Sequence, residues 1–191
     1  MKQFVILLLI IFCHFTLFGQ TINSFSLPNT VDGSSFSLAT YHADKAIVIL
    51  FISGKCAYTD HYIARIKAIN NEFTGKGVKL ILINSNNSDF VTEESPEEMK
   101  KFAAIHNLNI PYLADKNKTI KKLLQATRTP EVFVLKPTQD QFSVVYKGAI
   151  DDNPQSASDV THAFLSEALV NLLNNNKIKL NQTRPIGCLI K

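Results

Sequence analysis

Ala46-Ile-Val-Ile-Leu-Phe-Ile-Ser53 is the stretch of sequence that decides the fold class. Its continuous apolar run, rich in β-branched residues, predicts a strand buried on both faces, as in a parallel sheet. Gly54-Lys55-Cys56 follows directly, and from Asp60 apolar side chains recur at helical spacing. These are Ile63, Ile66, Ile69 and Phe73. The stretch therefore predicts a buried strand and then a helix, with a cysteine between them.

The rest of the chain continues this alternation. A second buried strand is predicted at 78–83, and Ser95 followed by Pro96 is typical of a helix start, with the helix running to about 106. The further elements expected are a turn-rich extension or hairpin at 25–37, a short strand at 110–113, a short helix at 118–125, a hairpin of strands at 131–136 and 143–150, and an amphipathic helix at 160–173. Strand-helix-strand units predict a parallel portion with helices on its faces, and the hairpin adds antiparallel strands. The chain is therefore expected to be one α/β domain.

Composition excludes several classes of protein. With 191 residues, 46% hydrophobic and 19% charged, the chain is too apolar for a disordered protein and has no repeat of a fibrous one. The net charge of +4 is thinly spread, so no nucleic-acid partner is indicated. Three cysteines are too few for a disulfide scaffold and lack zinc-site spacing. Nothing in the sequence indicates haem, flavin or nucleotide, so no cofactor is expected.

Residues 1–20 have the pattern of a secretory signal peptide. Lys2 precedes about a dozen apolar residues, and cleavage is expected near Gly19 or Gln20. A retained membrane anchor is the alternative, although the run is short for a membrane span. Cleavage would remove Cys13 and place the mature protein outside the cytoplasm, secreted or periplasmic, with no stable membrane span. The expected organisation is then a signal at 1–20, a domain at 21–176 and a tail at 177–191.

Cys56 is the strongest candidate for chemistry. The first N–H groups of a helix are unpaired, and with the helix dipole they stabilise a thiolate. Lys55 adds a neighbouring cation, and His61 could lie near the same helix end. Sites in α/β proteins cluster at the carboxyl ends of strands, where Cys56 is expected. The alternative is a small buried hydrophobe, as free cysteines often are.

Thr129-Pro130 is the second signal. Pro130 immediately precedes an apolar strand, so it is not itself a central strand residue. A cis proline at this edge would place the backbone of Thr129 beside Cys56. The alternative is an ordinary trans proline in a loop.

These features together resemble the thioredoxin fold, an α/β fold with a central mixed sheet and helices on both faces. Within it, the chain is similar to bacterial redoxins of the peroxiredoxin-like, alkyl hydroperoxide reductase type, from about Phe25 onward. The stretches that carry the resemblance are 51–62, 83–86, 128–133, 148–154 and 183–188. The resemblance implies a thiol-disulfide oxidoreductase with Cys56 as nucleophile. Its partners would be protein thiols and disulfides, or peroxide, with an electron donor that the sequence does not name.

The residues around Cys56 depart from both the thioredoxin-type and the peroxidase-type pattern. A thioredoxin-type site resembles Cys-x-x-Cys, but Thr59 stands in the second position, and Lys55 and Ala57 replace the usual His and Pro. The peroxidase pattern resembles Pro-x-x-x-Thr-x-x-Cys. Here Ser53 could stand for the Thr, while Ile49 occupies the proline position. The place of the peroxidase arginine corresponds to Pro130, with Arg128 nearby, so peroxidase activity is the second hypothesis.

Cys188 is the remaining candidate partner of Cys56. Attacking and resolving thiols need to be close only in space, and Pro185-Ile-Gly187 would turn the tail toward a surface. The alternative is a free thiol on a mobile tail. A third hypothesis for the whole protein follows, a non-catalytic module in which a Cys56–Cys188 bond fastens the tail.

Three charged groups are expected to be structural. The acidic group of 93–98 is explained by helix capping and a solvated helix face. Asp151-Asp152-Asn153 could bind a cation, but a turn is favoured. The lysines at 116, 118, 121 and 122 are expected on a solvated helix face.

Overall fold

The computed structural model describes residues 19–86 and 92–191. Most of the expected signal peptide, and Cys13 with it, therefore lies outside the described residues. A six-stranded sheet runs through the centre of the domain, with the strand order β1-β9-β8-β4-β5-β6. Its strands are β1 (Thr21–Ile22), β4 (Ala46–Phe51), β5 (Val78–Asn84), β6 (Tyr112–Ala114), β8 (Glu131–Pro137) and β9 (Phe142–Gly148).

The sheet is mixed, as the sequence predicts. β4 pairs in parallel with β5, from Ala46↔Val78 to Phe51↔Ile83, and β5 pairs in parallel with β6. On its other side β4 pairs with β8 in the antiparallel sense, and β8 and β9 form the expected hairpin. All six residues of β4 are buried, which explains its unbroken apolar sequence.

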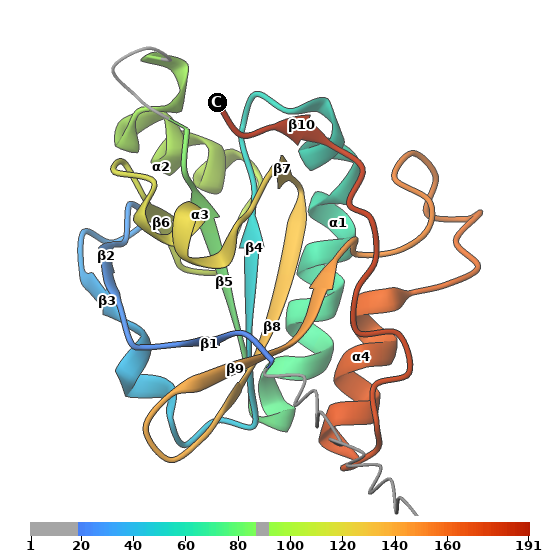
Figure 1. Ribbon diagram of the computed structural model, residues 1–191. Helices are drawn as coiled ribbons and strands as arrows, with labels where there is room; N and C mark the ends of the chain where they lie inside the picture. The colour runs from blue at the N-terminus through green and yellow to red at the C-terminus, as the bar shows by residue number, and fades with distance from the viewer. Residues whose placement is uncertain (1–18, 87–91) are drawn as a thin grey trace, which may run out of the picture.

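Helices cover both faces of the sheet, which confirms the expected architecture (Figure 1). Alternate residues of β4 such as Val48 and Leu50 pack toward one face, with α1 (Ala57–Phe73), α2 (Pro96–Ile105) and α4 (Phe164–Leu173). Ile49 and Phe51 pack toward the other face, with α3 (Thr119–Leu124) and the N-terminal hairpin. That hairpin consists of β2 (Ser26–Pro28) and β3 (Ser35–Ser37), followed by the short helix η1 (Leu38–Tyr41). Further short helices are η2 (Thr74–Lys76) and η3 (Thr92–Glu94).

The starts of two elements differ from the sequence-based expectation by two residues or more. α1 is not one of them, because it begins at Ala57, directly after Cys56, as expected. α4 begins at Phe164 rather than at 160, because the preceding residue has a non-helical backbone (φ −88°, ψ 68°). β6 lies two residues later than expected, since its pairing with β5 runs from Leu82↔Tyr112 to Asn84↔Ala114.

The C-terminal segment returns to the end of the sheet at which Cys56 follows β4. After α4 it runs along β9, where the Thr183 N–H donates to the Lys147 carbonyl (3.0 Å). It then forms β10 (Cys188–Leu189), antiparallel to β7 (Arg128–Thr129), near the top of the view in Figure 1. Ile190 is buried in the core beneath α3. Among the described helices, none has both the length and the apolar composition to cross a membrane.

Candidate active site

Cys56 lies at the amino-terminal cap of α1, directly after the turn that follows β4. Its backbone is extended (φ −103°, ψ 115°), and its N–H donates to the Ser53 carbonyl (3.2 Å). The Thr59 N–H donates to the Cys56 carbonyl (2.8 Å), which closes the first helical turn. The side chain caps nothing, so the sulfur is available for other contacts. This places the Cys56 sulfur at the positive end of a helix of 17 residues.

Cys56 and Cys188 are joined by a disulfide, with Cα atoms 5.9 Å apart and a sequence separation of 132 residues. The separation of Cα atoms lies in the ordinary range for a disulfide. Cys56 is 1% exposed, whereas Cys188 is half-buried. Cys188 is therefore bonded to Cys56 and is not a free thiol on a mobile tail. The segment that carries it is paired as a strand.

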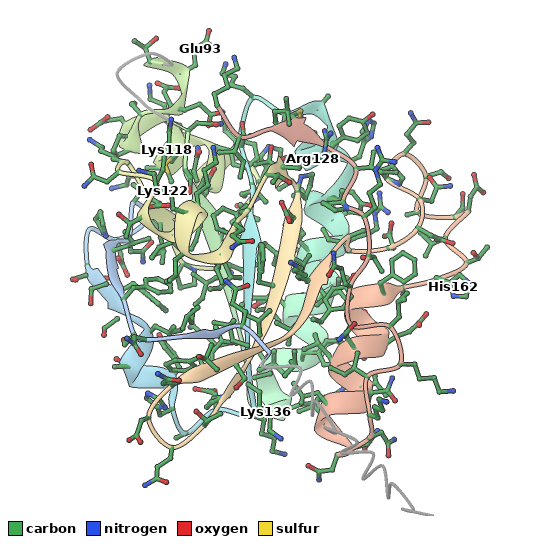
Figure 2. The ribbon with its side chains drawn as sticks, in the orientation of Figure 1. Glu93, Lys118, Lys122, Arg128, Lys136 and His162 are labelled. Carbon is green, nitrogen blue, oxygen red and sulfur yellow. A yellow bond between two sulfur atoms is a disulfide. The ribbon has the colours of Figure 1, made fainter. Side chains whose placement is uncertain are left out.

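Thr129 and Pro130 lie against this disulfide. The Thr129–Pro130 peptide bond is cis, and the Cys56 sulfur lies 3.1 Å from the Thr129 carbonyl oxygen. In the β7–β10 ladder, Cys188 is the direct partner of Thr129. The Arg128 guanidinium donates to the Gly187 carbonyl (2.8 Å), so it binds the tail one residue before Cys188. Figure 2 labels Arg128 close to β10.

Glu131, which no sequence pattern singled out, fixes the backbone of β7. Its carboxylate accepts hydrogen bonds from the N–H groups of Thr127 (2.7 Å) and Arg128 (2.9 Å). Glu131 is nonetheless buried at the start of β8. An acidic residue at the start of an otherwise apolar strand was the available signal.

The other predicted residues of the turn have unequal roles. Lys55 is exposed, and its backbone N–H donates to the Ser53 hydroxyl (3.1 Å). Thr59, which stands in place of a second cysteine, is buried, and its hydroxyl accepts from the Ser53 N–H (3.4 Å). His61 is exposed on α1. Lys55 and Thr59 thus both form hydrogen bonds with Ser53, at the start of the turn that carries Cys56.

Glu94 corrects one expectation. The acidic group of 93–98 was expected on a solvated surface, but Glu94 is only 3% exposed. Its carboxylate accepts from the Ser53 hydroxyl, from Asn84 Nδ2 (2.5 Å) and from Asn86 Nδ2 (3.1 Å). The expectation was wrong because η3 turns this one side chain inward, whereas Glu93 stays exposed.

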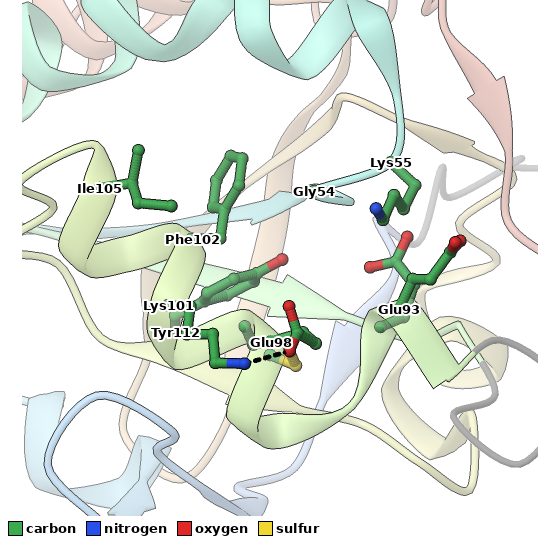
Figure 3. Close-up of a pocket in the computed structure, with 10 residues that line it drawn as sticks. Gly54, Lys55, Glu93, Glu98, Lys101, Phe102, Ile105 and Tyr112 are labelled. Atoms are coloured by element: carbon green, nitrogen blue, oxygen red, sulfur yellow. Dashed lines mark hydrogen bonds and ion pairs between the residues drawn. The ribbon is translucent and has the colours of Figure 1, made fainter.

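A pocket of about 200 Å³ lies between the turn that follows β4, η3 and α2 (Figure 3). Its walls include Gly54, Lys55, Phe102 and Tyr112. Burial, assisted by the charge of Glu94, raises the pKa of Tyr112 well above its usual range. The Tyr112 hydroxyl therefore stays neutral at physiological pH.

Asp151 forms a buried cluster on the α1 side of the sheet. The Tyr62 hydroxyl donates to it (2.8 Å), and Arg65 forms an ion pair with it (2.6 Å). Burial and the bond to Asp151 raise the pKa of Tyr62. Asp151 also accepts from the Asn153 N–H (3.1 Å), which is the turn geometry favoured above. Within 19–86 and 92–191, no group of three or more His, Cys, Asp or Glu side chains is arranged to hold a metal ion.

A mixed sheet, a cysteine at the start of the helix after the central strand, and a cis proline facing that cysteine define the thioredoxin-like fold. The AhpC/TSA family model matches residues 18–151, and the chain belongs to this family. The fold and the redoxin resemblance expected from the sequence are thereby confirmed.

Solved structures share this fold. An uncharacterized conserved protein from Geobacillus kaustophilus is 33% identical, with 91% of each chain covered and a TM-score of 0.83. The peroxidoxin BcpB from Mycobacterium tuberculosis is 18% identical, with 81% of this chain and 94% of that chain covered and a TM-score of 0.57. A putative thiol:disulfide interchange protein DsbE from Chlorobium tepidum is 13% identical, with 81% and 96% covered and a TM-score of 0.58. Among curated proteins, none matches this sequence.

Proposed function

We propose that this protein is an extracytoplasmic thiol-disulfide oxidoreductase in which Cys56 is the nucleophile and Cys188 the resolving cysteine. The observation that carries the proposal is the disulfide between Cys56, directly before the first turn of α1, and Cys188, on a tail strand paired with Thr129. The location outside the cytoplasm is supported by the signal-like residues 1–20 and by the compartments in which disulfides persist.

The position of Cys56 favours the thiolate after the bond is reduced. The unpaired N–H groups of the first turn of α1 and the helix dipole both stabilise negative charge there. A thiolate stabilised in this way is also a good leaving group. Thr129 and Pro130 present a backbone carbonyl to the same sulfur, where a partner's cysteine would arrive.

The proposed exchange is balanced in two steps. The Cys56 thiolate attacks a partner disulfide, forms a mixed disulfide and releases one partner thiolate. Cys188, as a thiolate, then attacks the Cys56 sulfur, forms the Cys56–Cys188 bond and releases the second partner thiolate. The partner is reduced by two electrons and the protein is oxidised by two. An external dithiol returns the protein to its reduced form, entering at Cys188, which is the more exposed of the two residues.

Two variants test the assignment of roles. Cys56→Ser is expected to abolish exchange with a model disulfide, while Cys188→Ser is expected to accumulate the mixed disulfide on Cys56, detected by mass spectrometry. Full activity in Cys56→Ser would overturn the proposal. Alkylation of Cys56 in Cys188→Ser at mildly acidic pH measures the thiolate directly.

Thiol peroxidase activity is the second candidate, favoured by membership of the AhpC/TSA family. Cys56 would then be oxidised by peroxide to a sulfenic acid, which Cys188 would convert to the disulfide with loss of water. Arg128 is the nearest arginine to the expected family position, and its guanidinium binds the Gly187 carbonyl. A reaction of reduced protein with hydrogen peroxide no faster than that of a free thiol would exclude this candidate.

The third hypothesis, a non-catalytic module fastened by the disulfide, makes a different prediction. A structural disulfide has a reduction potential below about −300 mV. A potential well above this value would favour exchange, and one below it would favour the structural role.

A further inference from the structure

We propose that Glu94 is a positioning residue for the Cys56–Cys188 disulfide. Its buried carboxylate binds the turn that carries Cys56 on one side and, through Asn86, the tail that carries Cys188 on the other. The inference deepens the proposed function, because the same bond would form and break during exchange. Its test measures an equilibrium instead of turnover, so it succeeds or fails whether or not the protein catalyses exchange.

Both oxygens of the Glu94 carboxylate accept hydrogen bonds. Oε1 accepts from the Ser53 hydroxyl and from Asn86 Nδ2 (3.1 Å), and Oε2 accepts from Asn84 Nδ2 (2.5 Å). Within 19–86 and 92–191, no Lys, Arg or His forms an ion pair with it. A buried carboxylate without a cation depends on these donors. These three donors therefore fix the position of the Glu94 side chain.

On the Cys56 side, the contact is made through Ser53. The Ser53 hydroxyl donates to Glu94 and accepts from the Lys55 N–H (3.1 Å). The Ser53 carbonyl accepts from the Cys56 N–H (3.2 Å). Ser53 thus connects the Glu94 carboxylate to the backbone of Lys55 and Cys56, which positions the Cys56 sulfur.

On the Cys188 side, the contact is made through Asn86. Its Nδ2 donates to Glu94, and its Oδ1 accepts from the Lys191 N–H (3.1 Å). Between Cys188 and Lys191, Ile190 is buried, and its N–H donates to the Thr127 carbonyl (3.0 Å). The tail is therefore held on both sides of Ile190.

One oxygen joins the two segments, because Glu94 Oε1 accepts from both Ser53 and Asn86. An amide in place of the carboxylate cannot keep all three bonds. With its nitrogen at the Oε2 position it meets the Asn84 amide donor, and in the flipped orientation it meets the donors of Ser53 and Asn86. Glu94→Gln therefore loses either the bond to Asn84 or both bonds of the junction, and in both orientations it removes the charge to which Ser53 and Asn86 donate, while it keeps the side-chain volume.

The experiment measures the equilibrium of the protein with glutathione. One Cys56–Cys188 bond and two glutathione thiols are exchanged for two protein thiols and one glutathione disulfide. Glu94→Gln is expected to shift this equilibrium toward the reduced protein, by about tenfold when one hydrogen bond to a carboxylate is lost from the oxidised form alone. Glu93→Gln removes a carboxylate at the neighbouring exposed position and is expected to leave the equilibrium unchanged.

A double-mutant cycle tests the junction without changing Glu94. Ser53→Ala breaks the contact on the Cys56 side and Asn86→Ala breaks the one on the Cys188 side. If both act through the same carboxylate, their effects on the glutathione equilibrium are non-additive. The cycle decides the question if Glu94→Gln does not fold. Additive effects would overturn the proposal. So would a Glu94→Gln protein that loses the same unfolding free energy in its oxidised and reduced forms, with the glutathione equilibrium unchanged.

Discussion

The α-carbon of Gly187 packs directly against the carbonyl of Thr129. A Cβ atom built at Gly187 would lie 2.1 Å from the Thr129 oxygen and 2.6 Å from its carbonyl carbon. The neighbouring residue on the tail is Cys188, which is paired with Thr129 in the β7–β10 ladder. Only a residue without a side chain allows the tail to approach this closely, so Gly187 determines how deeply the second cysteine can reach.

The first prediction follows from this contact. In Gly187→Ala the added methyl group forces β10 away from Thr129, and we expect the Cys56–Cys188 bond to be reduced more readily by glutathione. The control is Gly75→Ala, because a Cβ at Gly75 has no atom within 4 Å. Equal reduction equilibria for the two variants would contradict the steric argument.

The second prediction concerns the stability that the disulfide provides. It spans 132 residues, and the chain-entropy model gives about 4–5 kcal/mol for a loop of this size. We expect Cys188→Ser to lower the free energy of unfolding toward this amount, measured by urea denaturation. Reduced wild-type protein should show a similar loss. A loss below about 1 kcal/mol would mean that residual structure in the unfolded chain, or strain in the folded protein, offsets the loop-closure entropy.

The third prediction concerns the Asp151 cluster. Asp151→Asn removes the anion that pairs with Arg65 and leaves the guanidinium partly buried, since the two side chains are 4% and 14% exposed. Breaking a buried pair from one side costs about 3 kcal/mol or more. Denaturant titration should show this loss in Asp151→Asn and almost none in Asp159→Asn, where the aspartate is exposed.

The fourth prediction is a loss of stability at alkaline pH. Burial raises the pKa of Tyr146 to about 12, and the Tyr146 hydroxyl contacts the Ala149 carbonyl (2.6 Å) and the Thr183 hydroxyl (2.7 Å). Between pH 10 and 12 the unfolded chain releases this proton while the folded chain retains it, so the folded state binds more protons and stability falls as pH rises. The contribution is fully present below pH 10. Tyr146→Phe should flatten this part of the stability profile, and an unchanged slope would assign the effect to other tyrosines.

The fold could be predicted because its signals are local. The apolar run of β4, the helical spacing in α1 and the capping sequence at Ser95 each specify one element through contacts within a few residues. Their order along the chain then limits the topology. The start of α4 was less predictable, because the loop before it is fixed by a distant contact, the Asp152 N–H bonded to the His162 carbonyl (3.1 Å).

The site was predictable only in part. Cys56 could be recognised because its position between a strand and a helix is a local feature. The inward orientation of Glu94 could not, since Glu93 and Glu94 are identical in type and adjacent in sequence, and only contacts with Asn84 and Asn86 distinguish them. The position of Cys188 likewise depends on a ladder between segments about sixty residues apart in sequence, which local patterns do not specify.

The bond between Cys56 and Cys188 also determines how the protein responds to proteases. Within the part of the chain that the structure describes, the four α-helices all lie between these two cysteines. A single cut anywhere in that interval leaves the two pieces covalently joined, so the nicked protein keeps its mass and remains one molecule until a reductant is added. Only a cut before Cys56 or after Cys188 releases a fragment directly. In an environment rich in proteases, the redox state of one bond therefore decides whether internal damage becomes loss of a fragment.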